Sequence, residues 1–335
     1  MVLAFFIQHA IPSPVEITKL ATQYILQEKR QFPNHELTLY QITHAIKSLG
    51  LDPVTIFVRN NAKTLQANIY AYLSAGIPLL LLLNSPQGGH AVAVTGYSVN
   101  KGLPTRASTL YPEDFIVTST CVDKIYVHDD QIGPFARAEL FGSNESLGAY
   151  EMPPKELRAA NEFFYSFSYE ILIAPVYHKI RIGYDTILRA VYSLHNAFMH
   201  IIAPGTSGVH EAFRHIVAQL GTKGNLHWDI YLSTSNQFKE KCRDDPLLAA
   251  EERARALQKE IPRFIWIADA KCKDNVLFSL VFDATDIAEG RLLVHDVEYN
   301  FPFIPALREL FEYEDTNGTN LPPYFKTIKA WVLQL

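Results

Sequence analysis

The sequence has few cysteines and no paired arrangement of them. Among its 335 residues only Cys121, Cys242 and Cys272 are cysteines, and no two of them form a Cys-x-x-Cys pair. An odd count without such pairs argues against a disulfide framework and against a zinc ribbon. The thiols are therefore predicted to be reduced and buried, which is typical of a cytoplasmic protein.

Long hydrophobic runs and an excess of positive charge are also missing. The longest apolar stretch, residues 77–83, is far shorter than the roughly 20 residues that a bilayer-spanning helix needs. Thirty Lys and Arg residues against thirty-five Asp and Glu residues give a net charge of -5. We therefore expect neither a membrane nor a nucleic acid as partner.

The first residues, Met1 to Ile7, are apolar, with no basic segment before them and no small-residue cleavage site after them. They do not resemble a signal peptide. They resemble an internal segment of a chain.

The composition predicts a folded α+β protein of two parts. Hydrophobic residues make up 48% and charged residues 19% of the chain, which is ordinary for globular proteins. Residues 142–154 are rich in Gly, Ser, Asn and Pro and form the expected linker. The sequence thus predicts one domain over residues 1–141 and a second α+β domain over residues 155–335.

Local patterns predict the main elements of both parts. Thr38 and Gln41 fit a capping box, and Gly50 fits the C-terminal cap of the same helix. Residues 77–83 and 90–97 favour two adjacent antiparallel strands. In the second part, helical spacing predicts a helix over 187–201, and strands are expected at 169–176, 178–182, 228–232, 264–268, 276–283 and 291–299.

The most informative pattern is a histidine followed later by a carboxylate. His90 comes directly after Gly88 and Gly89, whose lack of side chains allows a substrate to approach closely, and Asp129 ends a later strand. A carboxylate beside an imidazole holds one tautomer and stabilises the imidazolium, as in a nucleophile, base and orienter triad. The alternative is a histidine with a purely structural hydrogen bond.

An ordered set of motifs resembles the papain-like cysteine peptidases of the bacteriocin-processing, double-glycine-leader type. The set consists of a helix over 42–50, LSAGIP at 73–78, GGHAVAVTGY at 88–97 and IYVHDD at 125–130. The resemblance covers about residues 1–135. It implies a papain-like fold for the first domain, His90 as general base and Asp129 as its orienter. Asp130 competes for the second role, because the family usually has Asp-Pro where this chain has Asp129-Asp130.

The nucleophile departs from the family pattern. The family's cysteine lies at the start of the first helix, and Met1 to Phe6 resemble later turns of that helix. The expected cysteine would therefore lie upstream of Met1. Cys121 precedes Asp129 by eight residues but lacks the helix start or strained turn that lowers a thiol pKa. Cys242 and Cys272 are interpreted as incidental.

No cofactor or metal is expected. His128 with Asp129 and Asp130, or His295 with Asp296, offers N and O ligands, but neighbouring residues of a strand point to opposite faces.

Three hypotheses follow. The chain derives from a cysteine peptidase or amidase acting on a peptide or protein substrate. Alternatively, it is a pseudoenzyme that binds a peptide or protein. In the third, the resemblance is fortuitous and the function lies in residues 151–335.

Overall fold

The computed structural model describes most of the chain as mixed α and β structure. The described residues are 6, 12–23, 37–59, 61–85, 88–100, 102, 104–130, 133–140, 148–150, 166–201, 226–272, 275–286, 291–299, 301–317 and 322–335. They form two compact units, the first made of residues 1–101 and 122–178 and the second of residues 102–121 and 179–335. The α+β class expected from the sequence is confirmed.

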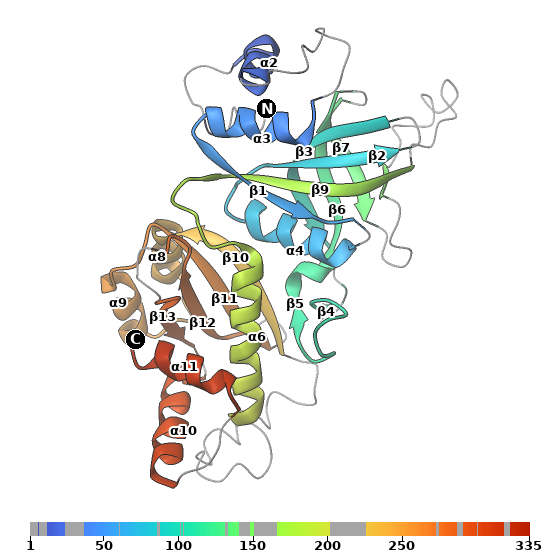
Figure 1. The fold of residues 1–335 in the computed structure, drawn as a ribbon. Coiled ribbons are helices and arrows are strands. Elements are labelled where there is room, and N and C mark those ends of the chain that lie inside the picture. Colours follow the sequence, from blue (N-terminus) through green and yellow to red (C-terminus); the bar gives the residue numbers. More distant parts are fainter. Residues whose placement is uncertain are drawn as a thin grey trace. The chain divides into compact units, whose positions relative to one another are not determined.

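The first unit is built around a seven-stranded sheet (Figure 1). Its helices are α2 (Pro14–Thr22), α3 (Leu39–Ser48) and α4 (Ala62–Leu73), and its strands are β1 (Leu51–Phe57), β2 (Leu79–Ser85), β3 (Gly88–Val99), β6 (Val122–Asp129), β7 (Gly133–Leu140), β8 (Gly148–Tyr150) and β9 (Ser166–Tyr177). The strand order is β1-β9-β2-β3-β6-β7-β8, and β8 also pairs with β9. The strands from β9 to β8 therefore form a closed antiparallel ring, and β1 extends it.

The helix predicted from the capping box is confirmed. Thr38 accepts from the backbone N–H of Gln41 and the Gln41 side chain accepts from the Thr38 N–H. Gly50 follows the helix with φ +81°, a conformation that glycine adopts without strain. The adjacent antiparallel strands expected over 77–97 are also confirmed, as β2 and β3.

The two faces of β2 are covered by different elements. Leu80 and Leu82 pack in one cluster with Phe6 and with Leu39 and Ile42 of the α3 region. Leu79, Leu81 and Leu83 alternate with them and point to the other face, where they are buried. Figure 1 shows α3 and α4 on opposite sides of this sheet.

The second unit has a six-stranded sheet with the order β13-β12-β11-β10-β5-β4. Its elements are β4 (Thr105–Arg106), β5 (Ile116–Val117), a 3-10 turn η1 (Thr118–Cys121), α6 (Tyr184–Ile201), β10 (Leu226–Thr234), α8 (Ser235–Asp244), α9 (Ala250–Gln258), β11 (Phe264–Cys272), β12 (Asn275–Asp283), β13 (Leu293–Glu298), α10 (Phe303–Asn317) and α11 (Tyr324–Val332). The expected helix over 187–201 and the strands from 228 onward are confirmed.

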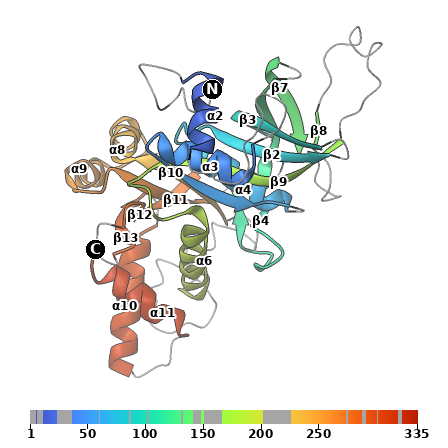
Figure 2. The ribbon, with the colours of Figure 1, turned by 45° about the horizontal axis from the view of Figure 1, so that its top comes forward.

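Helices cover both faces of this sheet (Figure 2). On one face, Phe238 and Cys242 of α8 and Ala256 of α9 pack with Ile267 and Val281 of the sheet. On the other face, aromatic side chains dominate: Phe198 of α6 and Phe303 of α10 lie against Phe278 of β12. The sheet thus separates two core layers, of which the one beneath α6 and α10 is rich in phenylalanine.

The two units divide the chain differently from the expected boundary at 142–154. Strand β9, which the sequence placed in the second domain, inserts between β1 and β2 of the first sheet. Residues 102–121 belong to the second unit, because Ile116 and Val117 of β5 pair in parallel with His227 and Trp228 of β10. Residues 148–150 of the expected linker form strand β8, and its remaining positions lie outside the described residues. The expected strand over 169–176 is confirmed as part of β9, whereas the strand expected over 178–182 is wrong, because these residues form turns and irregular structure after β9 ends at Tyr177.

No described helix is long and apolar enough to span a membrane.

Candidate functional site

His90 is positioned by the pairing of β3 with β2. It lies opposite Leu83 in the antiparallel register, so both side chains emerge on the same face of the first sheet. That face also carries the buried side chains of Val92 and Val94. Gly89 and Gly88 precede His90 in the strand and are exposed, which leaves backbone accessible beside the imidazole.

Asp129 and Asp130 approach the imidazole from the end of β6. His90 Nε2 lies 3.0 Å from Oδ1 of Asp129 and 3.8 Å from Oδ1 of Asp130. The side chain of Asp129 is 1% exposed and that of His90 is 11% exposed, whereas that of Asp130 is 84% exposed. The structure therefore brings together the three residues singled out from the sequence, with Asp129 nearer and buried.

In this arrangement Nε2 of His90 is the imidazole nitrogen that faces the carboxylate of Asp129. A carboxylate beside Nε2 favours the tautomer with its proton on that nitrogen, and such an imidazole accepts protons at Nδ1. An imidazole in this state can take up a proton from a nucleophile, which is the chemistry of a general base.

The described cysteines do not complete a triad. Cys121 is buried in the second unit, where its thiol donates to the carbonyl of Gly102 at 3.3 Å. Cys242 of α8 is buried, and burial raises the pKa of its thiol to about 11, which suppresses the thiolate. Cys272 is buried in β11. The prediction that the three thiols are buried is confirmed.

Other histidines considered from the sequence take separate positions. The ring of His128 lies 4.5 Å from that of exposed Phe135, and His128 alternates with Asp129 along β6. His195 is buried in α6, where its Nδ1 accepts from the indole N–H of Trp228 at 3.2 Å. Burial lowers the pKa of His195 to about 4, partly opposed by Asp114.

A polar cluster in the second sheet was missed from the sequence. Asp229 of β10 and Asp269 of β11 lie opposite each other and are buried. Lys271 forms an ion pair with Asp229, and Lys241 of α8 donates to Asp269 at 2.8 Å. The available signal was an aspartate inside each apolar strand pattern, in LHWDIYL and in FIWIADA.

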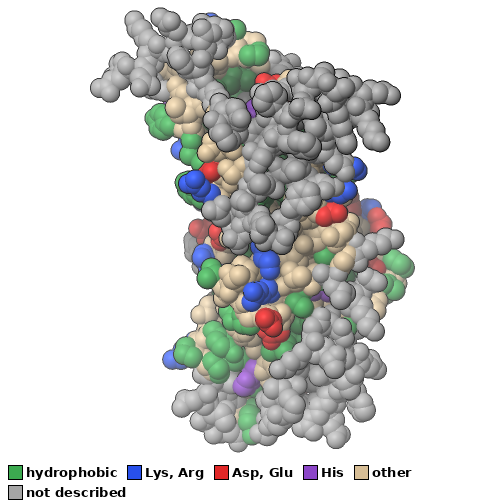
Figure 3. Space-filling model, turned by 90° about the vertical axis from the view of Figure 1, so that its right-hand side faces the viewer, with side chains coloured by type: hydrophobic (Ala, Val, Ile, Leu, Met, Phe, Trp, Pro, Cys, Tyr) green, Lys and Arg blue, Asp and Glu red, His purple; other side chains and the backbone are tan. Residues whose placement is uncertain are grey.

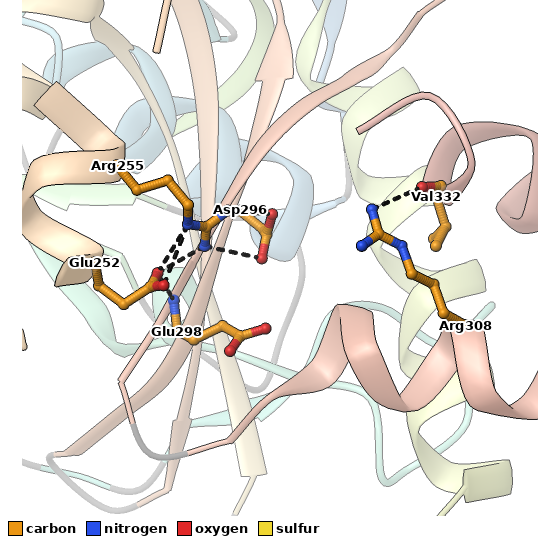
Figure 4. A network of polar contacts seen from close by, with 6 residues as sticks. All are labelled: Glu252, Arg255, Asp296, Glu298, Arg308 and Val332. Atoms are coloured by element: carbon orange, nitrogen blue, oxygen red, sulfur yellow. Dashed lines mark hydrogen bonds and ion pairs between the residues drawn. The ribbon is translucent and has the colours of Figure 1, made fainter. Parts of the chain in front are cut away.

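A second network holds α9 to the edge strand β13 (Figure 4). The guanidinium of Arg255 donates to Glu252 at 2.6 Å and to Asp296 at 3.1 Å. The backbone N–H of Glu298 donates to Glu252. Burial, together with the charges of Asp296 and Glu252, raises the pKa of Glu298 to about 7. Beside this network, Arg308 contacts the carbonyl of Val332.

The buried His295 of β13 makes the second unit sensitive to acid. Burial, followed by the positive charges of Arg255, Lys259 and Lys239, lowers its pKa to about 3, with Glu252 acting in the opposite direction. Below pH ~6.5 the unfolded chain binds a proton that the folded chain does not, so the free energy of unfolding falls as the pH drops from about 6.5 to about 3.

The free energy of unfolding of the parent protein falls between pH 7 and pH 5, and we expect His295→Leu to make this fall smaller by about 2 kcal/mol. The figure follows from about 1.4 kcal/mol for each pH unit over which only the unfolded chain binds the proton. Tryptophan fluorescence during urea unfolding measures this change, because Trp228, Trp266 and Trp331 all belong to the second unit.

Glu298→Gln is a control, because this substitution should change the pH dependence of the free energy of unfolding in the opposite direction. The folded pKa of Glu298 lies above its unfolded value, so proton uptake by this group stabilises the fold as the pH falls from about 7 to 4.5. Its substitution should steepen the acid loss. An unchanged pH dependence in His295→Leu would contradict the prediction.

Searches of family models, curated proteins and solved structures returned no match for this chain.

Proposed function

We propose that the first unit is a papain-like amide hydrolase unit in which His90 is the general base and Asp129 its orienter. The observation that carries the proposal is the 3.0 Å contact between His90 Nε2 and the buried Oδ1 of Asp129. The order of the sequence motifs supports it as well. The substrate class is a peptide or protein amide.

The reaction requires a thiol that approaches Nδ1 of His90. The thiol gives its proton to His90, its sulfur attacks the amide carbonyl carbon, and the carbon–nitrogen bond breaks as the imidazolium protonates the leaving amine. Water then hydrolyses the thioester. Asp129 stabilises the imidazolium throughout these steps.

In this proposal a segment upstream of Met1 supplies the nucleophile. Phe6 packs with Leu80 and Leu82, whereas His90 shares a face with Leu83. A helix that continues upstream from Phe6 must therefore bring its first turn past the edge of the sheet to reach His90. The proposal therefore places the thiol in the first turn of this helix, at the edge of the sheet beside His90.

The test compares two forms of the protein. A form extended by the in-frame codons before Met1 is expected to cleave peptide amides, and His90→Ala should lower kcat by about 10²–10⁴-fold, the usual contribution of general acid–base catalysis. His178→Ala is the matched control, because His178 forms an exposed pair with Asp52 in the same unit. An in-frame stop codon with no upstream cysteine would refute this proposal.

A second candidate function is binding of a peptide or protein without hydrolysis. It is favoured by the burial of all three cysteines and by the packing of Phe6 on the face away from His90. In this case the 335-residue chain binds its ligand, and an electrophilic thiol probe does not label it in a ligand-dependent manner. Labelling that a peptide competes away would exclude this candidate.

The charge distribution supports a peptide or protein ligand over a nucleic acid. On the face drawn in Figure 3, the described Lys and Arg side chains are interspersed with Asp and Glu and form no continuous basic field. The net charge of the chain is -5. Nucleic-acid binding relies on clustered positive charge, which neither observation supplies.

A further inference from the structure

The site around His90 also has the donor set of a divalent metal centre. One nitrogen of His90 and one carboxylate oxygen each from Asp129 and Asp130 all lie within 4.8 Å of one another. One imidazole with two carboxylates suits Zn²⁺, which binds nitrogen and oxygen ligands. Among the described residues this is the one group of this kind.

The spacing of the donors agrees with coordination of a single ion. Zn²⁺ bonds to imidazole nitrogen and carboxylate oxygen are about 2.0–2.2 Å long, so neighbouring ligand atoms of a tetrahedral site lie about 3.3–3.6 Å apart. The distances from His90 Nε2 are 3.0 Å to Asp129 and 3.8 Å to Asp130. They bracket the value required between the nitrogen and each oxygen, and all three donor atoms lie within 4.8 Å of one another.

Burial gives the three donors different parts in such a site. Asp129 and His90 are held by two paired strands and are largely buried, which fixes two ligands in advance. Asp130 is exposed, so its side chain can adjust at little cost and the ion can exchange with solvent. Three protein ligands leave a fourth position for water, as in open zinc sites.

The sequence did not suggest this combination because the third ligand is distant in the chain. Considered alone, His128 and Asp129 are adjacent in β6 and point to opposite faces of the sheet, and Asp130 follows the end of the strand. The pairing of β3 with β6 replaces His128 by His90, which lies 39 residues before Asp129.

We propose that His90, Asp129 and Asp130 form a reversible Zn²⁺ site. Resting on the proposed function, we further propose that the ion switches the general base off. An imidazole bound to Zn²⁺ through Nε2 carries its one remaining proton on Nδ1. The proton of the neutral ring moves from Nε2 to Nδ1, with no net release, and Nδ1 no longer accepts the proton of a thiol.

Isothermal titration calorimetry of the 335-residue chain with ZnCl₂ tests the site without any need for catalytic activity. We expect one saturable site that His90→Gln abolishes and whose Kd rises at least tenfold in Asp130→Asn. His178→Gln is the matched control, since the His178–Asp52 pair has one carboxylate and is exposed. Its Kd should stay within twofold of the original value. Mg²⁺ and Ca²⁺ should not bind, because they prefer sites made of oxygen ligands.

Two results would overturn the proposal. One is the absence of a saturable Zn²⁺ site, and the other is a site whose Kd in both Asp130→Asn and His90→Gln equals that of the unsubstituted chain. The second result would assign the ion to other groups, such as the cysteines. Because Asp130 is exposed, Asp130→Asn tests the site even if His90→Gln fails to fold. Failure of the hydrolase proposal leaves this titration unaffected. In an extended, active form, Zn²⁺ should inhibit hydrolysis, and EDTA should restore it.

Discussion

Asp129→Ala is expected to lower kcat for amide hydrolysis by about 10²-fold or more in a form of the protein that carries the upstream thiol. The carboxylate lies 3.0 Å from His90 Nε2 and is buried, so its removal leaves both the tautomer and the orientation of the imidazole unspecified. Misplacement of a catalytic group by about 1 Å can cost this factor. Steady-state kinetics with a peptide amide substrate measures the loss.

Asp129→Asn separates orientation from charge. The amide oxygen of Asn can occupy the position of Oδ1 beside Nε2 without its charge, and Cys-His-Asn arrangements operate in papain-like proteases. We therefore expect Asn to restore most of the activity that Ala removes. Asp52→Ala, in the exposed pair with His178, should stay within twofold of the parent protein. A larger loss in Asp130→Ala than in Asp129→Ala would assign the orienting role to Asp130 instead.

Local signals in the sequence predicted the elements of the fold well. The capping box of Thr38 and Gln41 and the positive φ of Gly50 define α3 through contacts within a few residues. The meander from β11 to β13 was also recognisable, because short connections join antiparallel neighbours. Such features depend on nearby residues alone.

Local sequence signals could not predict how the chain divides into two units. Strand β9 pairs with β1 across more than 100 residues, and β5 pairs with β10 at a similar separation. Apolar runs such as Ile171–Val176 fit several sheets equally well, and only the complete set of pairings selects one. Composition favoured a boundary at the polar segment 142–154, which the pairing of β8 with β9 crosses.

For the site, the sequence predicted the residues better than their contacts. His90, Asp129 and Asp130 were identified by their motifs, but the ranking of the two carboxylates required the distances and burial. The cluster at Asp229 and Asp269 was missed because an isolated aspartate in a strand does not reveal its lysine. Lys241 comes from α8 and Lys271 from β11, and tertiary packing alone brings each of them to its carboxylate.

The same cluster gives the largest expected effect on stability. We expect Asp269→Ala to lower the free energy of unfolding of the second unit by about 3 kcal/mol, because the hydroxyls of Ser279 and Tyr231 lose their charged acceptor, at about 1–3 kcal/mol each. Asp269 is 1% exposed and accepts from Lys241 at 2.8 Å, from Ser279 at 2.6 Å and from Tyr231 at 3.3 Å. Urea unfolding followed by tryptophan fluorescence reports this unit selectively.

A double substitution distinguishes a lost ion pair from general disruption. Asp269→Ala combined with Lys241→Met removes both charges, so the double variant should be more stable than the sum of the two single losses predicts. The exposed pair of Asp244 with Arg243 provides the matched control, and Asp244→Ala should leave the urea midpoint of unfolding close to that of the parent protein. A loss below about 1 kcal/mol in Asp269→Ala, or strict additivity with Lys241→Met, would show that the pair contributes little. Because Lys241 comes from α8 and Asp269 from β11, a measured coupling would also identify this contact as one that fixes α8 on the sheet.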